Sequence, residues 1–371
     1  MNCNDQTILG VCLRRPVALE TTRVWRTGQG GRELGRLLGT GEESDGHFPE
    51  DWIMSTVPAR NAGREDLPDE GLSYLSGHRL LLRDLIAAAP DEILGARHAA
   101  QFGPVPGVLS KIIDSSERAT IQVHPDKQTA ARLFHAPFGK TECWHVLALR
   151  PDAPEPPCVY LGFRPGVTRE QWMYVFARQD IPAMLACMNR FPVHPGDTWL
   201  VEAGVPHAVS ANFMFLELQE PTDFTIRTER QTPGGIPVPD RLCHQGLGFE
   251  AMFDCFHYGE PPRDYRVPRR TLAETPNYSR YELIGYAQTS CFRLHRLEIR
   301  TACPLTSGCV CSALFVYAGH GTLSCAGQDQ PLRPGVQYMV PACCEDMTLT
   351  AAPDETLTVF RCYGPELKER G

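Results

Sequence analysis

The chain has 371 residues, of which 42% are hydrophobic and 22% charged, a composition typical of a globular protein with room for two or three packed units. Its formal net charge is −8, and its Lys and Arg residues are scattered rather than clustered. This charge pattern argues against nucleic acid or an anionic membrane as a partner, although a local basic pocket could still bind a small anionic substrate.

The sequence predicts neither a signal peptide at residues 1–16 nor a membrane span. Residues 1–16 lack the apolar segment of a signal peptide, and no run approaches the roughly 18 apolar residues of a membrane span. The 15 cysteines are odd in number and irregularly spaced, which makes a disulfide framework a poor interpretation. We therefore expect thiols in a reducing compartment and a cytoplasmic protein.

The first hundred residues predict loops and helices. The glycine-rich stretch 28–41 matches neither G-x-G-x-x-G nor a P-loop and follows no clear strand, so we interpret it as a loop and a helix start. Residues 70–99 have the apolar spacing of a helical segment, interrupted at Pro90.

Short β-rich runs separated by Gly and Pro begin near residue 105. They include VLSKIID, RATIQVHP, ECWHVLAL and CVYLGF, and further runs follow a helical stretch at 169–189. After a Pro/Gly loop at 232–240 and a short helical piece near 244–255, strands fill residues 263–362. Many short strands at regular spacing predict a mainly β protein built from barrels or jelly rolls.

The two β regions follow one plan. The segment from Gly196 to His207 can be aligned with the segment from Gly335 to Asp346, each with a glycine turn, a strand and a second turn. This resembles the second motif of cupins, although the second copy has no histidine. We therefore predict a double cupin with a helical N-terminal portion and a helical insertion. Residues 1–262 would form the catalytic cupin domain and 263–371 a degenerate one without a metal.

Four polar residues form a candidate metal site. Strand alternation places Gln122 and His124 on one face, opposite Ile121 and Val123. Two motif residues further along the chain, Glu142 and His207, complete a set of imidazole, carboxylate and amide ligands. Such ligands suit zinc and would also accept iron, manganese or cobalt. Alone, each residue is more often structural, so the prediction depends on the set.

Several segments together resemble the class I mannose-6-phosphate isomerases. They are QVHPDK, GKTECW, the GD…AGVPHA turn and ELQEPTDFTIR, and they occur in the order found in that family. The resemblance implies a double cupin with one zinc ion per chain, bound by Gln122, His124, Glu142 and His207 in the first cupin.

The same resemblance implies further site residues. Arg227 matches the active-site arginine of the family, and Glu217 and Asp223 match acidic positions of its pocket. Lys140, Thr120 and Lys127 would contact substrate. Departures such as Ile226 in place of the usual tyrosine leave the pocket rim and the exact sugar open.

The expected reaction is the interconversion of mannose 6-phosphate and fructose 6-phosphate by proton transfer through an enediolate. A metal would stabilise the developing oxyanion, and a base would move the proton. The base is left open among Glu217, Asp223, a histidine and a metal-bound water. The oligomeric state is left open between monomer and homodimer.

Two alternatives differ in class from this reaction. A non-catalytic sugar-binding cupin would lose acid–base groups, whereas this chain keeps the full ligand set and Arg227. A metal cupin with different chemistry, such as an iron oxygenase, usually presents a closely spaced His-x-His or His-x-Asp pair, and here Gln122 stands at the first of those positions.

Overall fold

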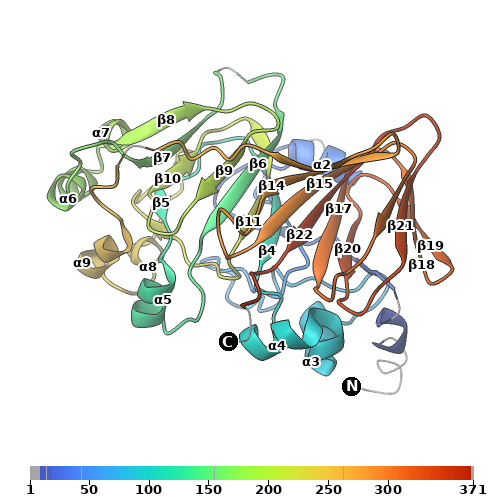
Figure 1. Ribbon diagram of the computed structural model, residues 1–371. Coiled ribbons are helices and arrows are strands. Elements are labelled where there is room, and N and C mark those ends of the chain that lie inside the picture. Colours follow the sequence, from blue (N-terminus) through green and yellow to red (C-terminus); the bar gives the residue numbers. More distant parts are fainter. Residues whose placement is uncertain (1–8, 14, 43, 154, 262, 369–371) are drawn as a thin grey trace.

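The computed structural model describes residues 9–13, 15–42, 44–153, 155–261 and 263–368. It contains four antiparallel sheets arranged as two β barrels side by side, with the second barrel in orange and red (Figure 1). This confirms the predicted mainly β, double-cupin fold. The predicted boundary residue 262 lies outside the described residues, and the division into two domains stays a prediction.

Two sheets make up the first barrel. The first has six strands, in the order β2 (Arg23–Val24), β3 (Glu50–Ile53), β4 (Leu109–Ser115), β11 (Phe213–Gln219), β6 (Glu142–Leu149) and β9 (Thr198–Val201). The second has five, in the order β12 (Ile226–Arg227), β5 (Gln122–Val123), β10 (His207–Val209), β7 (Cys158–Phe163) and β8 (Met188–Pro192).

The second barrel is built in the same way from later residues and one early strand. Its larger sheet has the order β1 (Val17–Leu19), β20 (Gln337–Val340), β17 (Ser312–Ala318), β22 (Leu357–Tyr363), β15 (Arg293–Ile299), β14 (Tyr278–Ile284) and β13 (Arg270–Glu274). Its smaller sheet has the order β16 (Ala302–Leu305), β21 (Met347–Ala351), β18 (Gly321–Cys325) and β19 (Gln328–Leu332).

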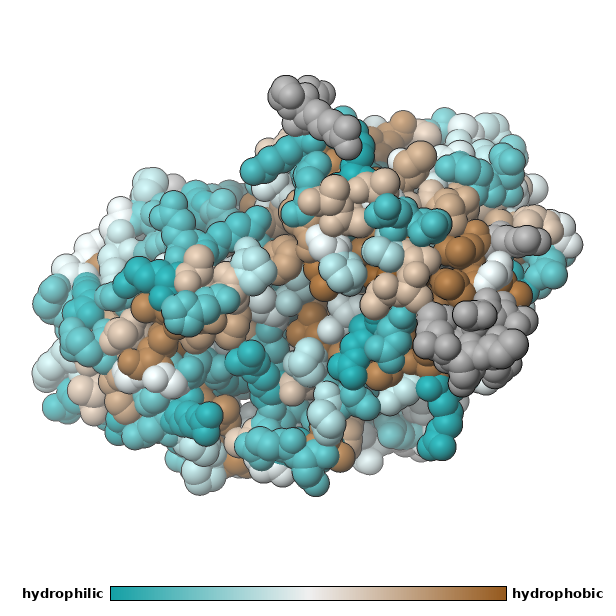
Figure 2. All heavy atoms as spheres, turned by 90° about the horizontal axis from the view of Figure 1, so that it is seen from below, coloured by the Kyte–Doolittle hydropathy of each residue, from teal (hydrophilic) through white to brown (hydrophobic). Residues whose placement is uncertain are grey.

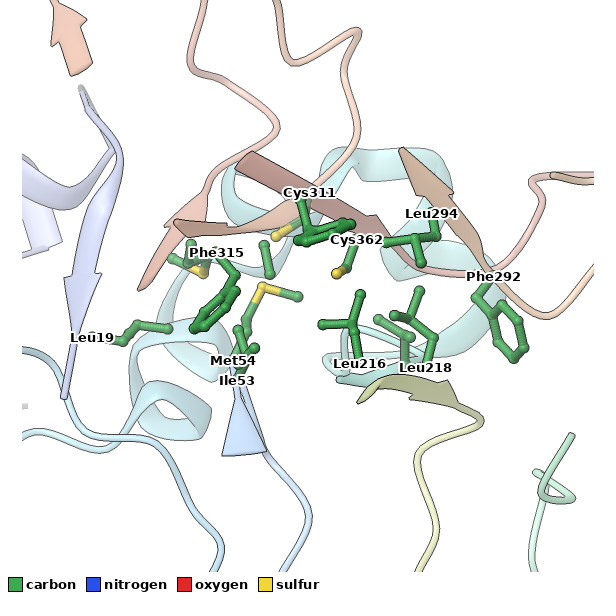
Figure 3. Packing of buried hydrophobic residues seen from close by; sticks show 14 of the residues in the cluster. Leu19, Ile53, Met54, Leu216, Leu218, Phe292, Leu294, Cys311, Phe315 and Cys362 are labelled. Carbon is green, nitrogen blue, oxygen red and sulfur yellow. The ribbon is translucent and has the colours of Figure 1, made fainter. Parts of the chain in front are cut away.

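Hydrophobic side chains from both barrels meet between the six- and seven-stranded sheets (Figure 3). Leu216 and Leu218 of β11 project into this layer, while the alternate residues Phe215 and Glu217 face the inside of the first barrel. Leu294 and Phe315 approach from the second barrel. The period-two alternation of each strand therefore fills two different cores.

The helices lie outside the sheets. They are α2 (Arg32–Leu38), α3 (Leu82–Ala88), η1 (Asp91–Gly95), α4 (Ala96–Phe102), α5 (Lys127–Phe134), α6 (Arg169–Arg178), α7 (Ile181–Ala186), α8 (Asp240–His244), α9 (Phe249–Met252) and η2 (Phe253–Cys255). Within the ranges given above, none of them combines the length and the apolar character needed to cross a membrane.

Both predicted helical segments are shorter than expected. Residues 70–81 form turns, because the backbone N–H groups of Leu75 and Leu82 are taken by the carbonyls of Leu80 and Ser73, so the helix begins only at Leu82. The insertion 169–189 is two helices and the start of a strand. Gln179 is left-handed with φ 50°, and the Asp180 carboxylate caps the second helix by accepting from Ala183 N–H.

The predicted repeat has the same strand placement in both copies. Thr198 and Gln337 each begin a four-residue strand two positions after a glycine, and those glycines have φ of 92° and 85°. A side chain at such a φ is strained, which explains why both turns use glycine.

Hydrophilic and hydrophobic residues are interspersed over the face of the molecule seen from below (Figure 2). The hydrophobic residues gather there in separate clusters. This face therefore does not present one continuous apolar surface.

Candidate active site

The two sheets of the first barrel bring three predicted ligands together. His207 of β10 is directly opposite Gln122 of β5, and His124 follows the end of β5. Glu142 begins β6 in the facing six-stranded sheet. The ligand atoms of His124, Glu142 and His207, called here the ligand cluster, all lie within 4.8 Å of one another, and all three residues are buried.

Backbone carbonyls fix the orientation of both imidazoles. His124 Nδ1 lies 2.8 Å from the Phe224 carbonyl oxygen and His207 Nδ1 lies 2.9 Å from that of Val205. Because each carbonyl accepts the Nδ1 proton, each Nε2 lone pair is left facing Glu142. The distances from these Nε2 atoms to the nearer Glu142 oxygen are 3.1 and 3.7 Å.

The protonation states of the cluster suit a cation ligand set. Burial, together with the ammonium group of Lys140, lowers the pKa of His124 to about 3, and burial also lowers the pKa of His207. Burial alone would raise the pKa of Glu142, but Lys140 and His124 outweigh it and hold it well below the usual range. Two neutral imidazoles and one carboxylate are therefore present at neutral pH.

The cluster fits a divalent metal ion. Glu142 Oε1 is paired with the Lys140 ammonium at 2.6 Å, whereas the buried Oε2 accepts no hydrogen bond from the part of the chain that the structure describes, which is costly unless a further cation compensates. The donors are imidazole nitrogen and carboxylate oxygen, a set used by catalytic zinc sites. The side-chain amide nitrogen of Gln122 lies 3.2 Å from His207 Nε2, so Gln122 adjoins the ligand cluster.

A cleft adjoins the ligand cluster, and most of the remaining predicted site residues line it. Its lining includes the predicted Thr120, Gln122, Lys140, Glu217, Asp223 and Arg227. Lys140 Nζ also reaches the cluster, at 2.6 Å from Glu142 Oε1 and 3.0 Å from His124 Nε2. The ligand cluster and the cleft are therefore one site.

The structure distinguishes the two acidic residues considered as bases. Burial, with the nearby Glu142 carboxylate, raises the pKa of Glu217. Burial would also raise the pKa of Asp223, but Arg26 and then Lys111 outweigh it and lower the pKa. Both Arg26 terminal nitrogens donate to Asp223 at 3.2 Å. Glu217 is thus the group better suited to proton transfer, and Asp223 holds a cation in place.

Arg227 is placed beside the cluster by β-sheet register. It lies opposite Gln122, which in turn lies opposite His207, so the three residues form a row across β12, β5 and β10. Its guanidinium donates only to the carbonyls of Thr225 and Leu242 and forms no ion pair with a described carboxylate. Burial lowers its pKa. Arg227 therefore retains donors for an anionic group.

The cleft residues that were not predicted from the sequence include Lys111, Arg26 and Glu50. Lys111 Nζ lies 3.0 Å from Glu217 Oε1, and Arg26 Nε lies 3.0 Å from Glu50 Oε1. Lys111 shares one strand face with Leu109 and Ile113, and this spacing could have indicated an inward lysine. Arg26 follows β2 and Glu50 begins β3, two short strands for which no sequence pattern indicates that these side chains would reach the cleft.

Lys127 is the one predicted substrate contact that the structure does not bring into the cleft. After β5, Pro125 turns the chain and the Asp126 carboxylate caps α5, whose first residue is Lys127. The Lys127 ammonium is half-exposed, lies 3.4 Å from Glu220 Oε1 and borders a different surface pocket.

The chain is similar in sequence to curated mannose-6-phosphate isomerases. It is 25% identical over 243 residues to the probable mannose-6-phosphate isomerase GmuF of Bacillus subtilis, covering 65% of this chain and 70% of that protein. It is 25% identical over 280 residues to the mannose-6-phosphate isomerase of Streptococcus mutans, covering 72% and 80%. No protein-family model matches the chain.

Solved structures share the fold over almost the whole chain. The mannose 6-phosphate isomerase from Bacillus subtilis superposes with a TM-score of 0.74 at 21% identity, covering 94% of this chain and all of that one. A putative mannosephosphate isomerase from Archaeoglobus fulgidus gives a TM-score of 0.71 at 20% identity, covering 95% and 98%.

Proposed function

Since the chain belongs to the mannose-6-phosphate isomerase family, we propose that it interconverts mannose 6-phosphate and fructose 6-phosphate with one zinc ion per chain. The observation that carries this proposal is the buried ligand cluster, which Gln122 and Lys140 connect to a cleft that also contains Glu217 and Arg227.

We infer that His124, Glu142 and His207 hold the zinc ion and that the Gln122 amide oxygen assists. The absence of thiolate from the set favours zinc or another borderline cation over soft metals. Cys143 follows Glu142 directly, but strand alternation turns its side chain into the core between the barrels. Bound zinc would supply Lewis-acid stabilisation of negative charge on the substrate oxygens.

The reaction moves one carbon-bound proton and one hydroxyl proton. We propose that Glu217, as carboxylate, accepts the proton from C2 of the aldose and returns it to C1, while the O2 hydroxyl proton passes to O1. The Lys111 ammonium at 3.0 Å and the Trp144 indole N–H at 3.1 Å hold this carboxylate in position. The pKa of Glu217 is raised towards neutral pH, and a carboxyl group with such a pKa can both accept a proton and return it.

The phosphate end of the substrate requires a cation that is not already paired. Arg26 is engaged by Asp223 and Glu50, and Arg118 is engaged by Glu229. Arg227 has no such partner among the described carboxylates, so we assign it to the phosphate or to the developing enediolate oxygen. A guanidinium can bind either group through two parallel hydrogen bonds.

The test is metal analysis of purified protein combined with an assay of mannose 6-phosphate conversion, with and without chelator. We expect about one zinc per chain, loss of turnover on chelation and recovery on adding zinc. A metal-loaded protein that binds the sugar phosphate without turnover would favour the non-catalytic alternative. Oxygen consumption without isomerisation would favour an oxygenase.

We also propose a cytoplasmic location. Thirteen cysteines in the described part of the chain form no disulfide bond, and most of them are buried, which suits a reducing compartment. Fractionation of the native host would test this. The oligomeric state stays open between monomer and homodimer, and sedimentation would decide it.

A further inference from the structure

We propose that the second barrel has a binding site of its own, which takes the phosphate group of a small phosphorylated molecule. The site is the cavity at one end of this barrel, of about 720 Å³, lined by Arg280, Arg293, His295, Arg361 and three tyrosines. This volume is in the range of small-molecule pockets. The inference does not depend on the isomerase reaction.

Strand register places the basic residues on the inner face of the barrel. Arg361 of β22 lies opposite His295 of β15, and Arg293 lies opposite Tyr363. Val359, two residues before Arg361, packs in the core of the second barrel, whereas the intervening Phe360 packs between the barrels. Arg361 therefore extends the inward row where the apolar core ends.

Arg361 is a buried cation without a counter-ion. Its relative exposure is 4%, its Nε donates to Ser312 Oγ at 2.9 Å, and its Nη2 has no partner within the described residues. Among the residues that the structure describes, no carboxylate forms an ion pair with Arg280, Arg293 or Arg361. Burying an uncompensated guanidinium costs several kcal/mol, which an anion in the cavity would offset.

The other two arginines are held in place by aromatic rings and a carbonyl. The Arg293 guanidinium lies 4.2 Å from the Tyr363 ring centre and 5.0 Å from that of Tyr286. Arg280 donates to the Pro304 carbonyl at 3.3 Å. These contacts orient the groups but leave their charge uncompensated, and guanidinium groups bind phosphate oxygens in pairs.

One carboxylate lines the cavity and a second contacts its lining residue His295, and together they limit which anion can enter. Glu282 lies 3.7 Å from His295 Nε2 and is already bound by the exposed Arg270 at 2.7 Å. Glu366 lines the rim. Since Glu282 is paired with Arg270, the three arginines exceed the one remaining carboxylate, Glu366, in charge. This excess of positive charge favours a compact multivalent oxyanion. The tyrosine rings of the wall offer a surface for a sugar ring attached to that phosphate.

The experiment is calorimetric titration of inorganic phosphate into the full chain carrying Arg227→Ala, which weakens phosphate binding in the first barrel. We expect remaining phosphate binding to weaken at least tenfold when Arg293→Gln is added. The matched control is Arg296→Gln, which removes the same charge from the opposite face of β15, where Arg296 pairs with Glu298 at 2.6 Å. Binding that is equally affected by both changes, or by neither, would overturn the proposal.

A second measurement covers folding defects and the source of the phosphate. In the Arg227→Ala background, Arg361→Met should raise the melting temperature in phosphate-free buffer and remove the further rise that phosphate gives the Arg227→Ala protein. Isomerase turnover of Arg293→Gln should stay native. The source of the phosphate is tested by comparing two ligands whose binding is weakened by Arg293→Gln. Tighter binding of a hexose 1-phosphate than of inorganic phosphate would support a sugar-phosphate ligand. Equal binding of the two would support free phosphate. Binding of the neutral hexose alone would contradict the proposal.

Discussion

The two barrels share a strand plan but differ in what they place inside it. In the first, the turn after β9 leads to His207, which faces Glu142 and His124 across the barrel. In the second, the equivalent turn after β20 leads to Asp346, which is exposed and has φ 55°. The polar side chains of the second interior are arginines at the barrel end instead.

This difference shows which positions a barrel must keep. The apolar residues of β9 and β20 occupy equivalent positions because each barrel needs a packed core. Residues at strand ends contribute less to packing, so they can carry a metal site in one barrel and an anion site in the other. The predictions below test this separation of roles.

The largest effect is expected from removing one ligand of the cluster. His207→Ala should abolish metal binding and lower turnover by on the order of a thousandfold or more, because the remaining groups cannot hold a Lewis acid in place. Metal analysis and the isomerase assay on the same sample measure both. The matched control is His320→Ala in the second barrel, where the imidazole is exposed and pairs with Glu355. Full metal occupancy in His207→Ala would remove His207 from the ligand set.

A smaller loss is expected from changing the unpaired arginine of the first barrel. Arg227→Lys should keep the fold and the metal but lose on the order of a hundredfold in turnover, the scale of one lost transition-state donor. The conservative control is Arg230→Lys, since Arg230 is partly exposed and stacks on Phe249. Native kinetics in Arg227→Lys, together with native kinetics in Arg227→Ala, would end the assignment of this residue to substrate.

The layer between the barrels should determine stability rather than chemistry. Leu216→Ala removes a fully buried side chain from this layer and should lower the free energy of unfolding by about 2–5 kcal/mol, with metal content unchanged. Urea denaturation followed by two probes measures the effect. The comparison variant is Leu323→Ala, inside the second barrel. If the two barrels unfold as one unit, both variants shift one common transition, and separate transitions would instead support the predicted division near residue 262.

The last predicted effect depends on pH and concerns a single buried acid at the same interface. Asp51 of β3 accepts the Thr22 N–H at 2.6 Å and faces the Gln337 amide of the second barrel at 3.2 Å. Burial raises its pKa to about 7, against about 3.9 in an unfolded chain. Between these pH values the folded chain holds a proton that the unfolded chain releases, so stability falls as the pH rises through this window.

Asp51→Asn should remove this dependence. The gain in the free energy of unfolding should be larger at pH 8 than at pH 5 by about 2–3 kcal/mol, because the folded chain must ionise the buried carboxylate only as the pH approaches its raised pKa. Denaturation at the two pH values measures the difference. Exposed Asp66→Asn is the control for a general charge effect, and an equal gain in both variants would contradict the role of burial.

The sequence by itself predicted the fold class and the family, and it supplied the candidate residues of the site. Strand alternation and motif order identified the ligand cluster and Arg227, because residue identity at fixed spacing within one strand sets which face a side chain occupies. It also predicted the matching glycine turns of the two barrels, since a positive φ leaves glycine as the unstrained choice.

Tertiary structure alone decided what depends on contacts between distant segments. Arg26, Glu50 and Lys111 reach the cleft through pairing of β2, β3, β4 and β11, which no local pattern encodes. Lys127 leaves the cleft because a proline turn and a helix cap redirect the chain. The pKa of Glu217 and the isolation of Arg361 likewise arise from the neighbours that packing supplies. Local spacing fixes a side chain's face, but only packing fixes its surroundings and therefore its charge and its reactivity.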